Sequence, residues 1–438
     1  GSLYCIWYLL GDEYQDVIDI LDDYMYDNCS ELYNQKVSAI NSLMFNNDIE
    51  FDKATGRLTL DLSTYQERGS ASDFGGTAFS GVYNITPYYN GMPVQSIKIK
   101  GAYKTKNSKG QNIESFIDSF ALSFDKDWEN DIDITLESVG VKTPLNAGFI
   151  DLSNITKKVK LTINYIGSNV IYAKDGIGKS TIIANDITIK STDSSASLEI
   201  KGSNGKDGAK AGANGANGSS AIEADNITIN SLGTFAAIGG NGGNGKDGAN
   251  GKNGSTNNDY EWIRNAYGIF HAHIKSVFRY LPAYNGSNGG NGGNGGNGGM
   301  PVKCNSISAT QGTIKFTYGN GGNGAKGGNG GKGGNGHNYY GETSDVAFIH
   351  AYDPGKGGDG GDGGKGGDAG HSVTLEYEFD CSNIEISVGS NGTAGIGGNG
   401  GGEGFGGAGG ETHISKTDHV VGKADDGRKG KRGSDGAA

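Results

Sequence analysis

Residues Gly286 to Gly299 read G-S-N-G-G-N-G-G-N-G-G-N-G-G, with glycine at every third position. A three-residue period matches the polyproline-II type of helix, which is left-handed and has about 3 residues per turn and about 3.1 Å rise per residue. Glycine then forms whole edges, and a bare edge lets another backbone approach until N–H and C=O groups pair between helices. The stretch predicts a bundle of polyglycine-II helices in which G-G-N triplets present two glycine edges and one polar edge.

Three other interpretations compete with the bundle. Glycine-rich sequence is most often a flexible linker. Collagen needs proline in its triplets, but the six prolines of this chain all lie outside the glycine runs. A calcium-binding nonapeptide repeat resembles Gly242 to Asn250, but the period around that segment is three and not nine. The period therefore favours the bundle, and the linker is the main alternative.

Composition limits what holds the chain together and what it binds. Of 438 residues, 34% are hydrophobic and 81 are glycine, so part of the chain cannot rest on an apolar core. A hydrogen bond contributes only about 1 kcal/mol net, while ordering a residue costs about 1 to 2 kcal/mol, so single glycine helices cannot stand alone. The net charge of −12 argues against nucleic acid as a partner, and the absence of an 18-residue apolar segment argues against a membrane span.

The chain divides into three regions by pattern. Residues 1–48 carry apolar positions at helical spacing and predict a small N-terminal helical segment, and residues 49–150 alternate as an all-β module. Residues 151–438 combine glycine runs with a recurring motif, which predicts stacked β-coils that carry insertions. The copies begin at Ala184, Ala224, Cys304 and Cys381, with a weaker one at Leu152, as in Ala184-N-D-Ile187-T-Ile189. Cys304 and Cys381 are expected as buried ladder residues, with a disulfide between them as the alternative.

The glycine runs occur in pairs around non-glycine segments, which predicts that each excursion leaves the β platform, turns and comes back. The segments Ser255 to Asn285, His337 to Pro354 and Glu411 to Asp426 should then gather in a shared tip far from the platform. Ile263, Tyr267, Phe270, Ile274, Phe278 and Leu281 recur at helical spacing between Asp259 and Pro282, which predicts a helix there. The expected fold class is mainly β plus a polyglycine-II helix bundle, with a stacked β-coil platform and a small N-terminal helical segment.

Aromatic residues concentrate in two of these tip segments, where they exceed the 9% found in the whole chain. Aromatic side chains either close the end of the bundle or grip a ligand. The candidate ligand-binding residues are Tyr260, Trp262, Tyr280, Tyr284, Tyr339, Tyr340 and Tyr352.

Other chemistry is weakly represented in the sequence. His271 and His273 lie two positions apart, which on a helix points them away from each other, so we expect no metal site. The segment Ala173 to Ser180 approximates a phosphate-binding loop but runs into a strand where a helix would have to begin, so we expect a β turn. No nucleophile with a base and no carboxylate pair stands out. The sequence therefore predicts no catalytic residue, no cofactor and no enzyme.

The runs Gly239 to Gly254, Gly286 to Gly299, Gly319 to Gly336 and Gly355 to Gly370, separated by aromatic-rich loops, resemble the adhesins on long tail fibres of T-even-like bacteriophages. The resemblance covers about residues 200 to 436 and implies polyglycine-II helices whose tip loops bind a receptor. The expected function is an extracellular or surface-exposed adhesin that binds a cell-surface glycan or protein, in an oligomer or larger fibre formed through the N-terminal region. The alternatives are a structural spacer or shell component, and a secreted toxin or polysaccharide-active enzyme.

Overall fold

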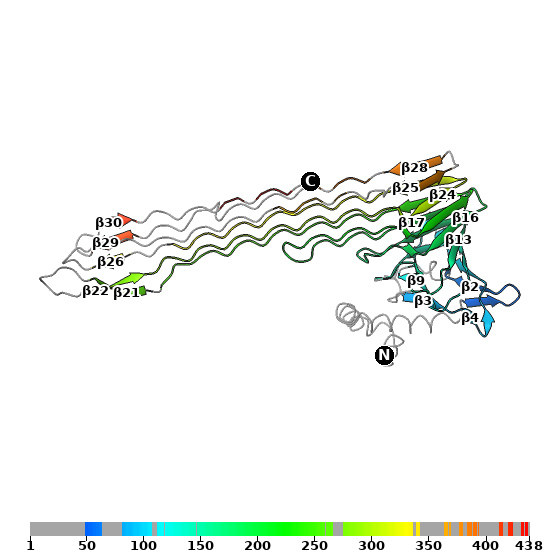
Figure 1. The fold of residues 1–438 in the computed structure, drawn as a ribbon, viewed down its shortest axis with the longest axis horizontal. Coiled ribbons are helices and arrows are strands. Elements are labelled where there is room, and N and C mark those ends of the chain that lie inside the picture. The colour runs from blue at the N-terminus through cyan, green and yellow to red at the C-terminus, as the bar shows by residue number, and fades with distance from the viewer. Residues whose placement is uncertain are drawn as a thin grey trace.

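The computed structural model describes a chain built from β-strands and long glycine-rich segments (Figure 1). The described residues are 49–63, 81–106, 112–117, 119–145, 147–258, 260–265, 275–335, 339–341, 363–366, 368, 376–379, 383–387, 389–391, 393, 411–414, 419–423, 431–432 and 434–436. The expected N-terminal helical segment, residues 1–48, lies outside them.

The expected fold class is wrong in its helical component. Every element in the described part of the chain is a β-strand, and the strands form parallel and mixed sheets instead of accompanying a polyglycine-II helix bundle. The described glycine-rich segments are extended and carry no helical assignment, and many of their backbone N–H groups donate to other segments of the chain. The three-residue period of glycine in this chain therefore marks extended segments whose backbones hydrogen-bond to one another.

Three large sheets form the platform at one end of the molecule. Sheet 1 contains, in spatial order, β1 (Ile49–Asp52), β2 (Arg57–Asp61), β6 (Ser96–Lys100), β10 (Ile132–Glu137), β13 (Lys160–Ile166), β16 (Asp186–Ser191), β19 (Asn226–Ser231), β24 (Ser306–Ala309) and β27 (Glu376–Phe379). Sheet 2 contains β11 (Gly140–Lys142), β14 (Ser168–Tyr172), β17 (Ser197–Lys201), β20 (Thr234–Ile238), β25 (Thr313–Thr317) and β28 (Asn383–Ser387). Sheet 3 contains β23 (Val302–Lys303), β18 (Ile222–Glu223), β15 (Ile182–Ile183), β12 (Ile150–Asp151), β9 (Phe120–Phe124) and β3 (Gly81–Ile85).

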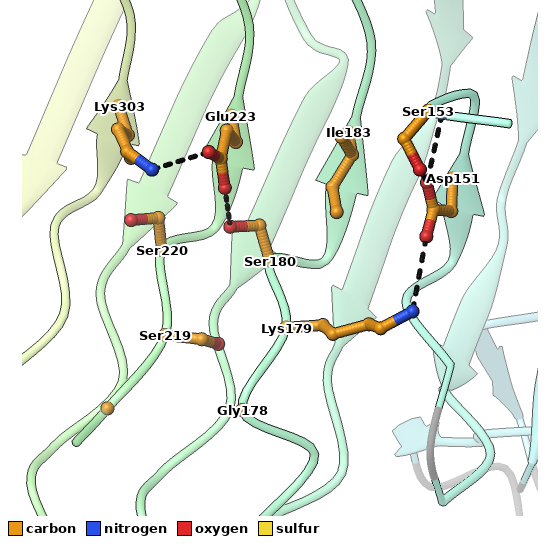
Figure 2. A pocket seen from close by; sticks show the side chains of 11 residues that line it. Asp151, Ser153, Gly178, Lys179, Ser180, Ile183, Ser219, Ser220, Glu223 and Lys303 are labelled. Carbon is orange, nitrogen blue, oxygen red and sulfur yellow. Dashed lines mark hydrogen bonds and ion pairs between the residues drawn. The ribbon is translucent and has the colours of Figure 1, made fainter.

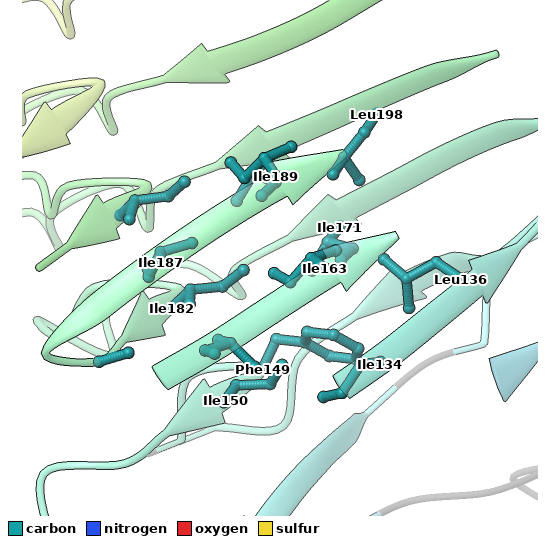
Figure 3. Packing of buried hydrophobic residues seen from close by; sticks show 14 of the residues in the cluster. Ile134, Leu136, Phe149, Ile150, Ile163, Ile171, Ile182, Ile187, Ile189 and Leu198 are labelled. Atoms are coloured by element: carbon teal, nitrogen blue, oxygen red, sulfur yellow. The ribbon is translucent and has the colours of Figure 1, made fainter. Parts of the chain in front are cut away.

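The chain winds through the three sheets in a fixed order, so that a turn such as β15–β16–β17 is one coil and the next coil stacks on it in parallel register. Like residues therefore fall into columns, as where Ile134, Ile163, Ile189 and Ile229 are successive register partners. All four residues are fully buried. Their side chains, together with those of sheets 2 and 3, fill the space between the sheets (Figure 3). β-Branched side chains suit strands whose inner face is buried, so these columns are the hydrophobic core of the platform.

The repeated motif identifies the coils correctly in three of its copies. Ile187, Ile227 and Ile307 are register partners in sheet 1 and are buried. The copy that begins at Cys381 is displaced, because its Ile384 pairs with Ile314 of sheet 2, while Tyr377 of β27 takes the sheet 1 position beside Ile307. The weak copy that begins at Leu152 is also wrong, because its Ile155 does not take the equivalent position in sheet 1. Leu161 is the register partner of Ile187 instead.

The glycine excursions that follow β17 and β20 leave the platform at one corner, where the chain passes from sheet 2 to sheet 3. The connection at this corner becomes longer from coil to coil. It is a short loop after β14, a hairpin of residues 202–218 after β17, and a long excursion of residues 239–299 after β20. Further excursions follow β25 and β28. Figure 1 shows the long excursions running side by side away from the platform. The expected out-and-back path is confirmed by antiparallel bonds between the two arms of residues 239–299, such as the one from Gly296 N to Gly243 O of 2.8 Å.

Triplets near the platform send their three N–H groups to three different neighbours. In Gly239-Gly240-Asn241, the first N–H donates to Thr317 O at the end of β25 and the second to Ser219 O, directly after the hairpin of residues 202–218. The third, Asn241 N, donates to the side-chain Oδ1 of Asn204 at 2.8 Å. Because a buried N–H without an acceptor is costly, this threefold division explains how the arms are held without a hydrophobic core.

Asparagine and aspartate side chains form columns that cross the layers, which we call the Asn ladder. Asn204 Oδ1 accepts from Asn241 N, Asn241 Oδ1 from Asn320 N, and Asn320 Oδ1 from Ser390 N. A parallel column joins Asp207, Asn244, Asn323 and Thr393. In the last position the Ser390 and Thr393 hydroxyls turn back and donate to the same Oδ1 atoms. The polar edge of the triplets thus binds the layers together.

Close backbone approach explains the glycine edges. A Cβ atom at Gly293 would overlap the carbonyl oxygen of Ala213, and one at Gly295 would overlap that of Gly322. Gly293, Gly296 and Gly299 are buried, whereas no residue from 245 to 254 is, which confirms the expectation that the G-G-N arm is the more enclosed. The described arms therefore require glycine at the positions where the carbonyl group of a neighbouring segment approaches this closely.

The far end of the arms carries short strands, and the helix expected there is wrong. β21 (Tyr260–Asn265) and β22 (Lys275–Tyr280) form an antiparallel pair with Trp262 opposite Phe278. The two arms enter this segment antiparallel and already bonded, with Tyr284 N donating to Ser255 O at 2.9 Å, so an antiparallel pair continues their arrangement. Strand-forming aromatic and β-branched residues then override the helical spacing.

Candidate functional site

The expected shared tip is partly a single sheet. β26 (Tyr339–Gly341) belongs to the excursion after β25 and β29 (Glu411–Ile414) to the one after β28, yet the two pair in parallel, with Tyr340 beside His413. β30 (His419–Lys423) pairs antiparallel with β29. Figure 1 shows β21, β22, β26, β29 and β30 together at the end of the arms, far from the three platform sheets. The prediction that these inserted segments meet is confirmed.

The structure places six of the seven candidate residues at or near this end. Tyr260 and Trp262 lie in β21, Tyr280 lies in β22 as the partner of Tyr260, and Tyr339 and Tyr340 lie in β26. Tyr284 lies on the returning arm with its side chain 53% exposed. Tyr352 lies outside the described residues. The backbone thus brings strands from two excursions that are distant in sequence to the same end of the molecule.

The histidines and cysteines considered from the sequence contribute less. His271 and His273 lie outside the described residues, and the described part of the chain holds no group of three or more His, Cys, Asp or Glu suited to a metal ion. Cys304 is a free, half-buried thiol that packs against the core, and its burial raises its pKa to about 11. Cys381 lies outside the described residues.

A polar pocket that the sequence did not indicate lies at the platform corner, where the excursions begin (Figure 2). Its volume is about 340 Å³. Along its upper edge run the register partners Asp151, Ile183, Glu223 and Lys303 of sheet 3. Residues that precede these strands complete the wall, namely Gly178, Lys179, Ser180, Gly218, Ser219 and Ser220, with Ser153 beside Asp151.

Two charged networks stand on either side of Ile183 in this pocket (Figure 2). On one side, Lys303 Nζ lies 2.5 Å from Glu223 Oε1, and Glu223 Oε2 accepts from the Ser180 hydroxyl at 3.1 Å. On the other side, Lys179 Nζ lies 3.5 Å from Asp151 Oδ2, while Asp151 Oδ1 accepts from Ser153 N at 3.0 Å. Each ammonium group is therefore matched by a carboxylate.

The segment that approximates a phosphate-binding loop forms part of this pocket. It connects β14 to β15 without a helix, in agreement with the expected turn, and Gly176 and Gly178 adopt positive φ angles of 82° and 66°. Lys179 and Ser180 project into the pocket, but they face carboxylates of neighbouring strands. A phosphate would have to displace both contacts, so the loop does not bind phosphate in the manner of its sequence pattern.

A second cluster joins aromatic rings at the start of sheet 2. Phe116 stacks on Tyr172 with ring centroids 5.6 Å apart and meets Tyr103 edge-on at 5.2 Å. The ammonium groups of Lys142 and Lys201 lie over the Phe116 and Tyr172 rings at 5.3 and 5.9 Å. Because lysines of the chain itself occupy these positions, the cluster is best explained as packing of the sheet surface.

Clustered carboxylates in a cleft beside Ile187 and Ile227 would favour an enzyme. Asp186 accepts a hydrogen bond from the Asn226 amide at 2.7 Å, and Asp225 lies 3.4 Å from Lys158 Nζ. Both take part in cross-strand contacts that stabilise the sheet surface. They offer no positive support for catalysis.

Comparisons with protein-family models, with curated proteins and with solved structures found no match to the chain. In the part of the chain that the structure describes, no helix is long and apolar enough to cross a membrane.

Proposed function

We propose that the chain is an extracellular receptor-binding protein whose glycine-rich arms hold an aromatic tip away from a β platform. The observation that carries the proposal is the parallel pairing of β26 with β29 at the far end, because it joins two excursions into one sheet. Loops held by a rigid scaffold are common places for binding residues. The aromatic content of the tip segments fits an interface, where tyrosine and tryptophan are enriched.

The arms favour presentation over flexible linkage. Every described layer is bonded to the next through backbone groups and the Asn ladder, with separations of 79 residues repeated at Asn241–Asn320, Asn244–Asn323 and Asn250–Asn329. Such a constant register means that the layers do not slide relative to one another. A tip on such arms is held at a fixed distance from the platform.

The test is binding of the full chain to host-type cells and to a glycan array. We expect Trp262→Ala and Tyr340→Ala each to weaken binding about thirtyfold, as for an aromatic anchor that contributes about 2 kcal/mol. Tyr88→Ala is the matched control, because Tyr88 is 63% exposed on the platform in β4 (Tyr88–Tyr89). Loss of thermal stability without loss of binding in the tip variants would show that these rings close the end of the arms.

A structural spacer or shell component is the second candidate, favoured by the Asn ladder along the arms. In that function, contacts would form along the sides of the arms and the tip would be dispensable. A variant without residues 260–280 distinguishes the two, since a spacer would still assemble and a receptor-binding protein would lose its ligand. A polysaccharide-active enzyme would be revealed by product release from a panel of polysaccharides.

A further inference from the structure

The pocket at the platform corner is independent of the tip, and its composition defines a ligand class. Two lysines and two carboxylates line it, and each lysine has its carboxylate within 3.5 Å. The lining is therefore electrically balanced. A balanced pocket gives no net attraction to an anion or a cation, and a charged ligand would have to compete with an existing ion pair.

Serine hydroxyl groups line the pocket together with the charged side chains. The Ser180 hydroxyl donates to Glu223, and Ser219 Oγ accepts from Ser203 N at 2.7 Å. Ser220 is 8% exposed and lines the same pocket. Ammonium groups only donate, carboxylates only accept, and serine hydroxyls do both. Adjacent hydroxyls of a sugar can satisfy such a mixed set, because each both donates and accepts.

Ile183 supplies the apolar part of the pocket. It lies between Asp151 and Glu223 in the register of sheet 3, and Figure 2 shows its side chain between the two charged networks. A sugar ring has one face of C–H groups that an isoleucine side chain can cover, while its hydroxyls extend to the polar walls. A volume of about 340 Å³ lies within the range of small-molecule pockets, which begins near 300 Å³.

We propose that this pocket binds an uncharged sugar unit, with Ile183 against the ring and the flanking Lys179–Asp151 and Glu223–Lys303 pairs bonding its hydroxyls. The site lies at the root of the arms, so its occupation does not depend on the tip. The proposal stands apart from receptor binding at the tip, and each can fail without the other.

The experiment is calorimetric titration of the full chain with D-glucose, D-galactose, D-mannose and N-acetyl-D-glucosamine. D-Glucuronate, D-glucosamine and inorganic phosphate serve as charged probes. We expect at least one uncharged sugar to bind with a Kd of about 1 mM and to bind more tightly than every charged probe. No binding of any uncharged sugar at about 50 mM, or tighter binding of a charged probe, would overturn the proposal.

Two kinds of variant locate the binding. Ile183→Trp fills the pocket and should reduce sugar affinity at least about tenfold, whereas Ile166→Trp, at an isoleucine that is 48% exposed at the end of β13, should leave it unchanged. Trp262→Ala at the tip should also leave it unchanged. Unaltered affinity in Ile183→Trp places the sugar elsewhere and refutes the site.

Charge variants test the balance without filling the pocket, and they decide the matter if Ile183→Trp does not fold. Lys303→Met leaves one carboxylate in excess and should raise the affinity for D-glucosamine relative to that for D-glucose. Glu223→Gln leaves one ammonium in excess and should favour D-glucuronate instead. The same probe preference in both variants and in the original chain would contradict the assignment.

Discussion

Two glycines on one arm make a matched test of close backbone approach. Gly290 and Gly293 lie one triplet apart, and each donates to the outgoing arm of the same excursion, at 2.7 and 2.9 Å. They differ because the hairpin of residues 202–218 reaches Gly293 and ends before Gly290. An added Cβ at Gly293 overlaps Ala213 O, whereas at Gly290 the nearest atom is Ala249 N at 3.3 Å.

We expect Gly293→Ala to open the contact with the hairpin. The methyl group displaces Ala213 and Asn214, which breaks three bonds: Lys246 N to Ala213 O at 2.9 Å, Gly215 N to Asn294 O at 2.8 Å, and Asn294 N to Asn214 Oδ1 at 2.8 Å. At about 1 kcal/mol each, less about 0.4 to 1 kcal/mol for the smaller entropy of the unfolded chain, the net loss is roughly 2 kcal/mol. Gly290→Ala should change the free energy of unfolding by less than about 1 kcal/mol.

Hydrogen exchange measured by mass spectrometry reads this difference locally. Amides of residues 213–216 and 293–296 should exchange about thirtyfold faster in Gly293→Ala, which corresponds to roughly 2 kcal/mol. In Gly290→Ala they should exchange at the original rate. Equal acceleration in both variants, or none in either, would refute the idea that contact with the hairpin is what requires glycine.

Three further predictions concern the Asn ladder, the hydrophobic core and the half-buried Cys304 thiol. Asn294→Val removes the Oδ1 atom that accepts from Lys365 N and should lower the free energy of unfolding by about 1 to 2 kcal/mol. Asn294→Asp keeps an acceptor at this position, so equal melting temperatures for the two variants would contradict the role of the Asn ladder. Ile227→Asp buries an unpaired carboxylate in the core and should unfold the platform broadly, seen as loss of β signal in circular dichroism, whereas Thr228→Asp on the exposed side should not. The ordinary pKa of the Cys304 thiol is 9.0, and burial in the folded chain raises it to about 11. As pH rises from 9 to 11, the thiol of the unfolded chain therefore loses its proton first, and the free energy of unfolding should fall. Cys304→Ala should lack this part of the decline when melting temperatures are compared across that range.

The sequence predicted the stacking of coils because identical residues recur at identical positions in parallel strands. It failed where two strands of one coil carry the same alternation. The Cys381 copy, with Ile384 and Ile386, fits sheet 1 by pattern but pairs with Ile314 and Phe316 of sheet 2. The pattern describes one buried face and does not distinguish which sheet supplies it.

The prediction of a helix at the tip failed because it considered that segment alone. The spacing of Ile263 and Phe278 fits a helix, but their strands are placed by arms that arrive antiparallel and already bonded at Ser255 and Tyr284. The Asn edge was likewise expected to be merely polar, since nothing in a single triplet shows that an Oδ1 atom will accept from another layer. Contacts of this kind depend on segments about 70 to 80 residues apart.

The pocket was missed for a related reason. Its residues come from four coils, and only Gly178, Lys179 and Ser180 belonged to the segment that resembled a phosphate-binding loop. Asp151, Glu223 and Lys303 occupy equivalent positions in successive strands of sheet 3 and therefore lie in one row. This row can be recognised only once the register of the strands is known, and the structure supplies that register. By contrast, the meeting of the tip segments followed from the paired glycine runs alone.

The constant register of the Asn ladder has a consequence for the reach of the molecule. A column survives a change in arm length only if the change is a whole triplet, since any other insertion brings glycine to the position of Asn241 or Asn244. The two arms that share the tip sheet already differ in this way, because Asn320 and Ser390 are 70 residues apart whereas the tip partners Tyr339 and Thr412 are 73 apart. The difference is one whole triplet, so the length of an arm between platform and tip is measured out in units of three residues.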